Sequence, residues 1–509
     1  MKTRKQIAAM AAFVTLSTVT AGPASALENQ FHGMFRLGGV VSNFVGTQPA
    51  DYYTYNGSNM FTNPNLTAAA NTRPEQPATA SFLDQRARIM YVGKIDEDLK
   101  LVTHFEVNSR WGDSDYSAGI SGGGAVGTDA VNLRTKNVYV DYTFHPGTLD
   151  INSKAGLQFI EDQYKGVFMA NDAAAAVFSS KVGDTSVRAG FSRFADNGGT
   201  NYALNTNSTG TASAATPYNT NGNLFGFNGT LLDVPQGSAG AAYGSVSADW
   251  WLVDVKHKVN DKFTIGGSYY LLYSDIARKL YGETSNTTNG YTATVKYKAN
   301  VHMLGVNAQG QAGPVELNGF VLYQFGKTVD KKLSAFTANV GAKSKLGPGT
   351  IKGEFLYMSG DDGKDADRTN GFVSIAGECG YMATDLQILA RDNTLIMTRN
   401  NALFYDNNAG QGVVLGFVGY TLPLNDRLSW KINTGYGAVS EQNQKVVKSS
   451  GKNLGAEFNM ALPFKAKENL TITPRFAYAV LGDFYDGLAA NGKTPDNPYL
   501  ASLIMSLAF

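Results

Sequence analysis

Basic side chains near the start of the chain recur with a spacing that would place them on one surface. Arg86 and Arg88 stand two residues apart, and Arg36 and Arg134 lie in the extended segments before and after them. Side chains two residues apart share a face of a β-strand, and neighbouring strands lie about 4.8 Å apart. These guanidinium groups would therefore form a ladder on one wall. Fixed charges along a narrow, low-dielectric passage select which ions enter it.

Acidic residues accompany the ladder. Glu106 and Asp141 fall on the same face as the arginines, Glu161 and Asp162 follow a later strand, and Arg188 extends the basic series. Because both signs are mixed, the pattern predicts only a slight preference for anions. A wall whose charges are simply solvated or paired with one another is the alternative.

The sequence gives little support to a catalytic function. The histidines come without a recognisable nucleophile motif, so we expect no enzyme; they are His32, His104, His145, His257 and His302. The single cysteine, Cys379, can form no internal disulfide, and the chain has no Cys-x-x-Cys-His site for covalent haem. We therefore expect no cofactor.

An acidic stretch is a weak candidate for a metal site. Its carboxylates are Asp361, Asp362, Asp365 and Asp367, and clustered carboxylates suit Ca²⁺ or Mg²⁺. Their spacing is not that of an EF-hand loop. We favour a solvated loop and expect no bound metal.

The segments that carry these residues alternate between apolar and polar side chains, which is typical of strands with one buried face. In Trp251, Val253 and Val255 against Asp254 and Lys256, for example, the period is two. About 18 such strands are expected, with 16 or 20 as alternatives. They lie near residues 31–41, 83–95, 100–111, 133–144, 149–159, 172–181, 185–194, 249–259, 263–274, 300–310, 315–326, 334–345, 350–359, 411–422, 428–439, 452–464, 470–481 and 497–509.

The connections between these strands alternate in length. Short ones carry Asp, Asn, Gly or Pro, as in His145-Pro-Gly-Thr148, and long ones such as 195–248 are rich in Ser, Thr, Asn, Gly and Ala. One additional pair of strands inside 371–404 stays open. This pattern predicts an all-β fold: a transmembrane antiparallel up-and-down β-barrel with short periplasmic turns and long extracellular loops. A soluble β-sandwich or propeller alternates too, but does not explain the asymmetry of the loops.

Charge and the two ends of the chain narrow the compartment. A net charge of +1 excludes a strongly basic nucleic-acid binder. Lys2, Arg4 and Lys5 precede a short apolar run and the small residues Ala24-Ser25-Ala26. Residues 1–26 are therefore expected to be a signal peptide, with a barrel domain over 27–509. The last strand ends at Phe509 with apolar residues at every second position before it.

A terminal aromatic residue that closes such a strand resembles the signature of bacterial outer-membrane β-barrels, which the barrel assembly machinery reads. The whole pattern resembles the Gram-negative general porins. That resemblance implies a homotrimer in the outer-membrane bilayer, and a loop after the fifth strand that folds inward. The corresponding residues are 159–172, with Glu161, Asp162 and Asp172 as acids opposite the arginine ladder.

The leading interpretation is a passive diffusion channel for small hydrophilic solutes and ions. Two alternatives differ in kind. One is a barrel that sheathes a multihaem cytochrome supplied by another chain, which requires a wide lumen. The other is an uptake channel selective for one class of substrate, for which Trp250, Tyr270 and Phe320 are scattered aromatic candidates.

Overall fold

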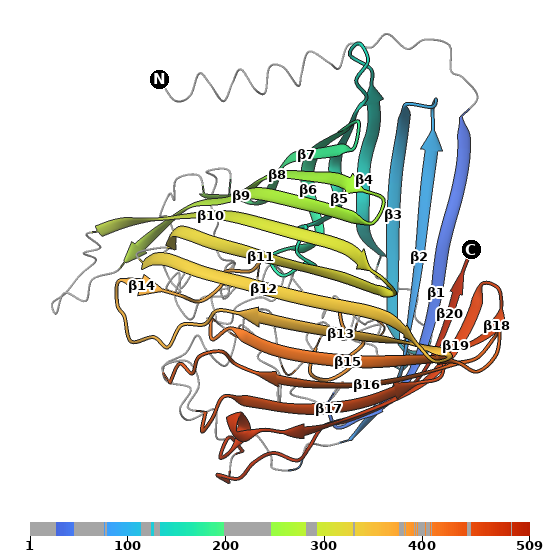
Figure 1. Ribbon diagram of the computed structural model, residues 1–509, viewed down its shortest axis with the longest axis vertical. Coiled ribbons are helices and arrows are strands. Elements are labelled where there is room, and N and C mark those ends of the chain that lie inside the picture. Colours follow the sequence, from blue (N-terminus) through green and yellow to red (C-terminus); the bar gives the residue numbers. More distant parts are fainter. Residues whose placement is uncertain are drawn as a thin grey trace.

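The computed structural model consists almost entirely of β-strands (Figure 1). It describes residues 27–44, 76, 79–112, 124–126, 133–197, 246–280, 293–328, 331–375, 381, 383–390, 392, 394, 403, 408, 410–444, 449–489 and 491–509. The expected signal peptide and Cys379 lie outside the described residues. Among the described residues, no helix is long and apolar enough to cross a membrane.

Strands of one continuous sheet form the wall. Two of its 20 strands are short, β14 (Arg368–Thr369) and β18 (Phe464–Lys467), which leaves 18 long ones. These are β1 (Glu28–Ser42), β2 (Ala80–Lys94), β3 (Leu99–Arg110), β4 (Leu133–Phe144), β5 (Ile151–Glu161), β6 (Ala170–Val182), β7 (Thr185–Asn197), β8 (Val246–Asn260), β9 (Phe263–Leu280), β10 (Ala293–Ala312), β11 (Val315–Thr328), β12 (Lys331–Leu346), β13 (Gly349–Met358), β15 (Val413–Pro423), β16 (Ser429–Ala438), β17 (Asn453–Ala461), β19 (Leu470–Leu481) and β20 (Tyr499–Ala508).

Each long strand pairs antiparallel with its neighbours in the sequence, and the sheet closes where β20 meets β1 (Figure 1). The closing register runs from Met34 opposite Ala508 to Ser42 opposite Leu500. The predicted fold, a closed 18-strand up-and-down barrel, is therefore confirmed. The turns at one end of the barrel are short, as predicted. Connections of two to five residues are enough to join antiparallel strands that are neighbours in the sheet.

The predicted boundaries were wrong in some places. Strands β9 and β10 extend into 275–280 and 293–299, which were expected to be loop. The described residues within 371–404 form no strand, so the structure does not show the additional pair there. Instead Arg368–Thr369 pairs parallel with Lys332 and Leu333 of β12, an arrangement that alternation alone does not predict.

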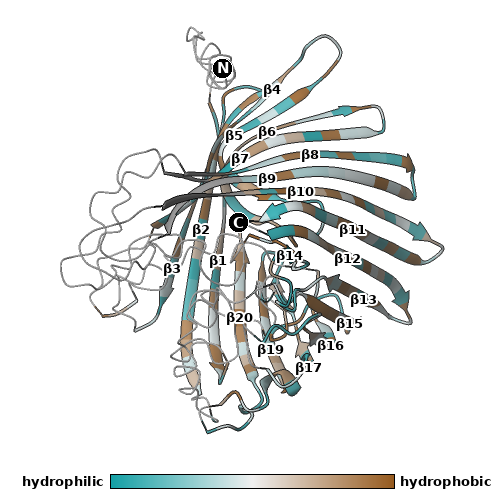
Figure 2. Ribbon diagram, turned by 90° about the vertical axis from the view of Figure 1, so that its left-hand side faces the viewer, coloured by the Kyte–Doolittle hydropathy of each residue, from teal (hydrophilic) through white to brown (hydrophobic). Residues whose placement is uncertain are grey.

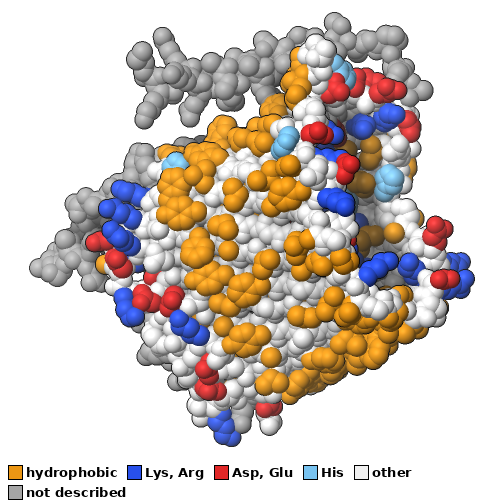
Figure 3. Space-filling view, in the orientation of Figure 1, with side chains coloured by type: hydrophobic (Ala, Val, Ile, Leu, Met, Phe, Trp, Pro, Cys, Tyr) orange, Lys and Arg blue, Asp and Glu red, His pale blue; other side chains and the backbone are white. Residues whose placement is uncertain are grey.

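Alternation gives the barrel two different faces. On β8, Trp251 and Val253 are exposed on the outside, whereas the intervening Trp250 and Leu252 are buried on the inside. Brown and teal alternate along β11 and β12 in Figure 2. In Figure 3 hydrophobic side chains spread across the strands, and charged ones gather toward the margins of this face. The face of the barrel in this view is thus an apolar belt with charges near its edges.

The seam between the two ends of the chain depends on a glycine. Gly33 of β1 and Phe509 exchange two backbone hydrogen bonds, of 2.7 and 3.0 Å. A Cβ atom on Gly33 would lie 2.5 Å from the Phe509 ring and 2.8 Å from the carbonyl oxygen of Arg88. The terminal aromatic ring therefore packs directly on the backbone of the first strand.

We expect Gly33→Val to weaken closure of the barrel, because the added atoms collide with the Phe509 ring and with backbone. Overpacking of this kind costs about 1–3 kcal/mol. The fraction of barrel that resists unfolding in cold SDS should fall, and the melting temperature should drop. Gly39→Val is the matched control, because its Cβ meets only the flexible end of Leu83, at 3.3 Å. Equal losses in both variants would contradict this role of the seam.

Candidate functional site

The loop between β5 and β6 folds into the barrel. Residues 162–169 wrap around the carboxylate of Asp162, which accepts four hydrogen bonds from backbone NH groups of its own loop. The donors are Tyr164 at 2.7 Å, Gly166 at 3.1 Å, Phe168 at 2.8 Å and Met169 at 2.9 Å. Burial raises the pKa of Asp162 to about 6, and these four hydrogen bonds oppose the rise. Asp162 therefore gives the loop its shape.

Aromatic side chains attach this loop to the inner wall. Tyr164 lies edge-on to Tyr270 and Phe320, with ring centroids 5.9 and 5.4 Å apart, and Phe168 lies 5.5 Å from Trp250. Such pairs contribute about 0.5–1.5 kcal/mol beyond their buried area. Tyr164, Phe168, Trp250 and Tyr270 are all fully buried. The lumen candidates Trp250, Tyr270 and Phe320 thus form a docking surface for the loop.

A second inward segment lies between β13 and β15. Glu457 on the inner face of β17 accepts hydrogen bonds from the NH groups of Gln387, Ile388 and Leu389, between 2.7 and 3.0 Å. The NH of Ile375 donates to the carbonyl oxygen of Phe168 at 3.0 Å, which joins the two inward segments. Both therefore fill the lumen beside β8–β17.

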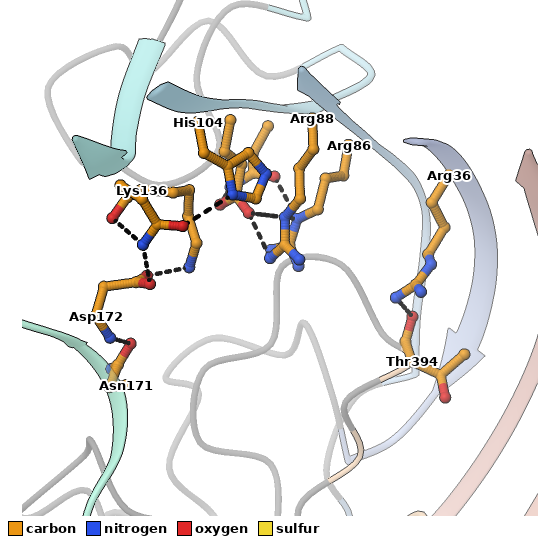
Figure 4. Close-up of polar contacts among 11 residues, drawn as sticks. Arg36, Arg86, Arg88, His104, Lys136, Asn171, Asp172 and Thr394 are labelled. Atoms are coloured by element: carbon orange, nitrogen blue, oxygen red, sulfur yellow. Dashed lines mark hydrogen bonds and ion pairs between the residues drawn. The ribbon is translucent and has the colours of Figure 1, made fainter. Parts of the chain in front are cut away.

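The arginine ladder lies on a different part of the wall. Arg88 donates to Glu106 at 2.6 Å, and Arg86 donates to Asn108 at 2.7 Å while its Nε lies 3.3 Å from Glu106 (Figure 4). Glu106 is almost completely buried, whereas the arginine side chains are 15% and 29% exposed. One buried acid thus holds two cations that both reach water.

The second inward segment approaches this ladder. Arg36 of β1 donates to the carbonyl oxygen of Thr394 at 3.0 Å (Figure 4). Nearby, Arg475 of β19 pairs with Asp392, and both side chains are almost completely buried. The inward segment therefore contacts one end of the ladder.

The other end of the ladder is a mixed polar network. Lys136 pairs with Asp172, Asn137 donates to Asp172 at 2.9 Å, and the His104 ring contacts Asn137 at 3.2 Å (Figure 4). Of the three acids named from the loop, only Asp172 meets the ladder in this way. His104 is a polar residue of the wall, and its side-chain contact is with an amide.

Of the remaining candidates, Arg134 lies beside the ladder, whereas Asp141 and Arg188 lie nearer the short turns. Arg134 pairs in register with Glu106, and Asp141 accepts a hydrogen bond from Asn152 at 2.6 Å. Arg188 binds Asp254 at 2.7 Å and the carbonyl oxygen of Glu161 at 2.8 Å. A cavity of about 740 Å³ lies here, lined by residues that include Glu161, Asp162, Arg188 and Asp254.

The carboxylates of the acidic stretch 361–367 accept hydrogen bonds from backbone NH groups of their own turns. Asp361 accepts from the NH of Gly363, Asp362 from Lys364, and Asp365 from Asp367 and Arg368. No cluster of three or more His, Cys, Asp or Glu side chains in the described part of the chain is arranged to hold a metal ion.

Glycines on the inner face mark where the inward segments dock. A Cβ on Gly305 of β10 would lie 2.2 Å from the Tyr164 hydroxyl, and one on Gly435 of β16 would lie 2.7 Å from Leu386. Alternation alone does not single out these glycines. One signal could have indicated a docked loop: a glycine among the inward-facing positions of a strand whose other inward-facing residues are apolar.

Together these features define a class of protein: a closed β-barrel with an apolar outside, narrowed by its own inward segments and lined with cations along one wall. No family model matches the chain, and no curated protein sequence matches it.

Solved structures of the same architecture are known. The chain is similar to Acinetobacter baumannii OccAB2, with a TM-score of 0.50 and 8% identity over 96% of this chain and 99% of that chain. It is similar to Acinetobacter baumannii OccAB4, with a TM-score of 0.50 and 10% identity over 96% and 100%. Another is the outer membrane protein opdK from Pseudomonas aeruginosa, with a TM-score of 0.47 and 8% identity over 94% and 99%. For the two Acinetobacter structures, at these identities, the likeness is one of fold.

Proposed function

We propose that the protein is a porin of the bacterial outer membrane, a water-filled channel through which small hydrophilic solutes and ions diffuse passively. The observation that carries this proposal is the closed barrel narrowed by inward segments that leave the basic wall facing water. The protein turns nothing over in this function. It excludes lipid, limits solute size and biases the charge of what passes.

The outer surface supports the compartment. Exposed apolar side chains such as Trp251, Leu304 and Val340 suit contact with the lipid bilayer, and charges lie near the edges of the belt. Residues 1–26 would direct export to the periplasm, and Phe509 would be read by the barrel assembly machinery. A homotrimer is part of this proposal.

The ladder would set ion preference. Arg86 and Arg88 together carry two positive charges against the single negative charge of Glu106, and the arginines are the more exposed partners. An ion that passes this wall meets a net positive field in a space with little bulk water, which favours anions.

Sheathing of a multihaem cytochrome is less well supported, because the inward segments occupy the lumen that such a partner would need. Loop 162–169 and the segment that carries Ile375 are buried against the wall and joined to each other. A channel selective for one class of substrate stays open as a refinement of the proposal.

Single-channel recording in planar bilayers tests the proposal. Purified protein should give stepwise, ohmic openings, in triplets if the assembly is a trimer. A salt gradient should give a reversal potential of the sign that anion preference requires. Absence of conductance from folded protein, together with haem retained during purification, would refute a diffusion channel and favour the cytochrome scaffold.

A further inference from the structure

We propose that Lys165 is a latch that pins the tip of loop 162–169 to the opposite wall and thereby sets the width of the pore. This inference rests on the proposed channel function. Lys165 acts as a positioning residue: its ammonium group is tied to the wall and shapes the space through which solute passes.

The ammonium group has three partners on three adjacent strands. It donates to Asn318 of β11 at 2.6 Å, to Asn339 of β12 at 2.7 Å and to Glu354 of β13 at 2.8 Å. A lysine ammonium has three hydrogens, so all of its donor capacity is used. The loop joins β5 to β6, and its tip is thus fastened to strands far from those that it connects.

The wall leaves room for this contact at Gly341. A Cβ atom at this position of β12 would lie 2.7 Å from the Asn318 side-chain oxygen and 2.7 Å from both carboxylate oxygens of Glu354. Any larger residue would press on two of the three acceptors of Lys165. Gly341 therefore forms the floor of a socket that fits an ammonium group and its acceptors.

The socket also holds the second inward segment. The Tyr381 hydroxyl donates to Glu354 at 2.9 Å and accepts from the Asn339 amide at 2.7 Å. Tyr381 belongs to the same connection as Thr394, which contacts Arg36 across the lumen. Glu354 is thus a common anchor for both segments that bound the pore, so loss of the latch should affect the whole constriction.

The left-handed backbone conformation of Lys165 indicates that a lysine is present here because its side chain is needed. Lys165 has a φ of 62° and Gly166 a φ of 74°. A residue with a Cβ atom rarely adopts the left-handed region, where glycine is favoured. Strained residues persist where their surroundings hold them, and they concentrate at functional sites. A glycine would fit this backbone better but could not reach the socket.

The test compares single-channel records of purified wild-type protein, Lys165→Met and Lys343→Met in planar bilayers. Lys343 is a matched control: it lies on β12, pairs with Glu316 in an exposed contact, and loses the same charge. We expect Lys165→Met to raise conductance about twofold and to add rapid current noise, because a released loop moves within the pore. Lys343→Met should remain close to wild type.

Charge exchange separates a latch from a general effect on folding. Lys165→Glu and Glu354→Lys should each give noisy channels, and the double exchange should be quieter than either. Resistance to cold SDS identifies folded barrel, and if Lys165→Met does not fold, Glu354→Gln takes its place with the same expected noise. A folded Lys165→Met or Glu354→Gln that records like wild type would overturn the latch, and so would a double exchange no quieter than the single ones.

A wild-type barrel that fails to conduct contradicts the channel function itself, whereas a conducting wild type with an unchanged latch variant contradicts only the latch.

Discussion

Replacement of Arg86 and Arg88 together by glutamine is expected to abolish the anion preference of the channel and to leave a weak cation preference. The pair and Glu106 carry a net charge of +1, and the double variant carries −1. A unit charge about 8 Å from a passing ion changes its energy by about 0.5–2 kcal/mol for effective dielectric constants of 80 to 20. Two charges of this size are enough to reverse a slight preference.

The measurement is the reversal potential in a tenfold gradient of potassium chloride. Perfect selectivity for one monovalent ion corresponds to about 59 mV, and we expect a shift of about 20 mV toward the cation side in the double variant. Addition of Glu106→Gln to the double variant should move the potential back toward zero, because these three positions then carry no charge. Glu106→Gln alone should strengthen anion preference.

Two controls separate the field of the ladder from changes in shape. Arg86→Lys with Arg88→Lys keeps both charges and should keep the wild-type potential. Lys343→Gln with Lys345→Gln removes two charges from the inner row of β12 near the short turns and should have a smaller effect. If the two glutamine pairs shift the potential equally, total lumen charge rather than the ladder determines the selectivity.

The barrel itself could be predicted because its information is local. A strand with lipid on one side and water or docked loops on the other must alternate, so each segment such as 249–259 identifies itself within a few residues. Strand ends are less well marked. β9 and β10 continue past the predicted ends, since nothing in the alternation of a strand indicates how far its pairing extends.

The interior of the barrel could be predicted only in part. The inward row that carries Arg86, Arg88 and Glu106 follows from period two, and the structure places these side chains together. The role of Asp162 cannot be predicted from the period of two. Its partners are NH groups of its own loop, and their positions depend on how the loop folds. The partners of Lys165 are more than 150 residues away in sequence, so no local pattern indicates them.

Asp162→Ala is expected to release loop 162–169 from its compact form and to raise single-channel conductance about two- to threefold. The substitution removes the acceptor of four backbone NH groups, all of which belong to buried residues: Tyr164, Gly166, Phe168 and Met169. A buried donor left without a partner costs about 1–3 kcal/mol. Several such unpaired donors would destabilise the docked conformation of this short loop, so the loop should rearrange.

The effect should be local to the loop. Regions that can open independently do so before the whole fold is lost, and the strands of the wall keep their own hydrogen bonds. We therefore expect the melting temperature of the barrel to change little while the conductance changes strongly. Asp162→Asn is the matched comparison: it keeps one side-chain oxygen that can accept from Tyr164 and Gly166, but its NH2 group faces the NH groups of Phe168 and Met169, so its conductance should lie between those of wild type and Asp162→Ala.

The pH dependence of the loop follows from the same carboxylate. Burial raises the pKa of Asp162 to about 6, above the value of about 3.9 expected in an unfolded chain. The docked loop therefore binds a proton more tightly than the released loop, and the contribution of this group to docking grows as the pH falls from about 6 to 4. Wild-type records should be quieter at pH 5 than at pH 8, and Asp162→Asn should lack this step. If Asp162→Ala and Asp162→Asn conduct alike, the carboxylate does not frame the loop, and the aromatic contacts of Tyr164 and Phe168 must be what hold it in the pore.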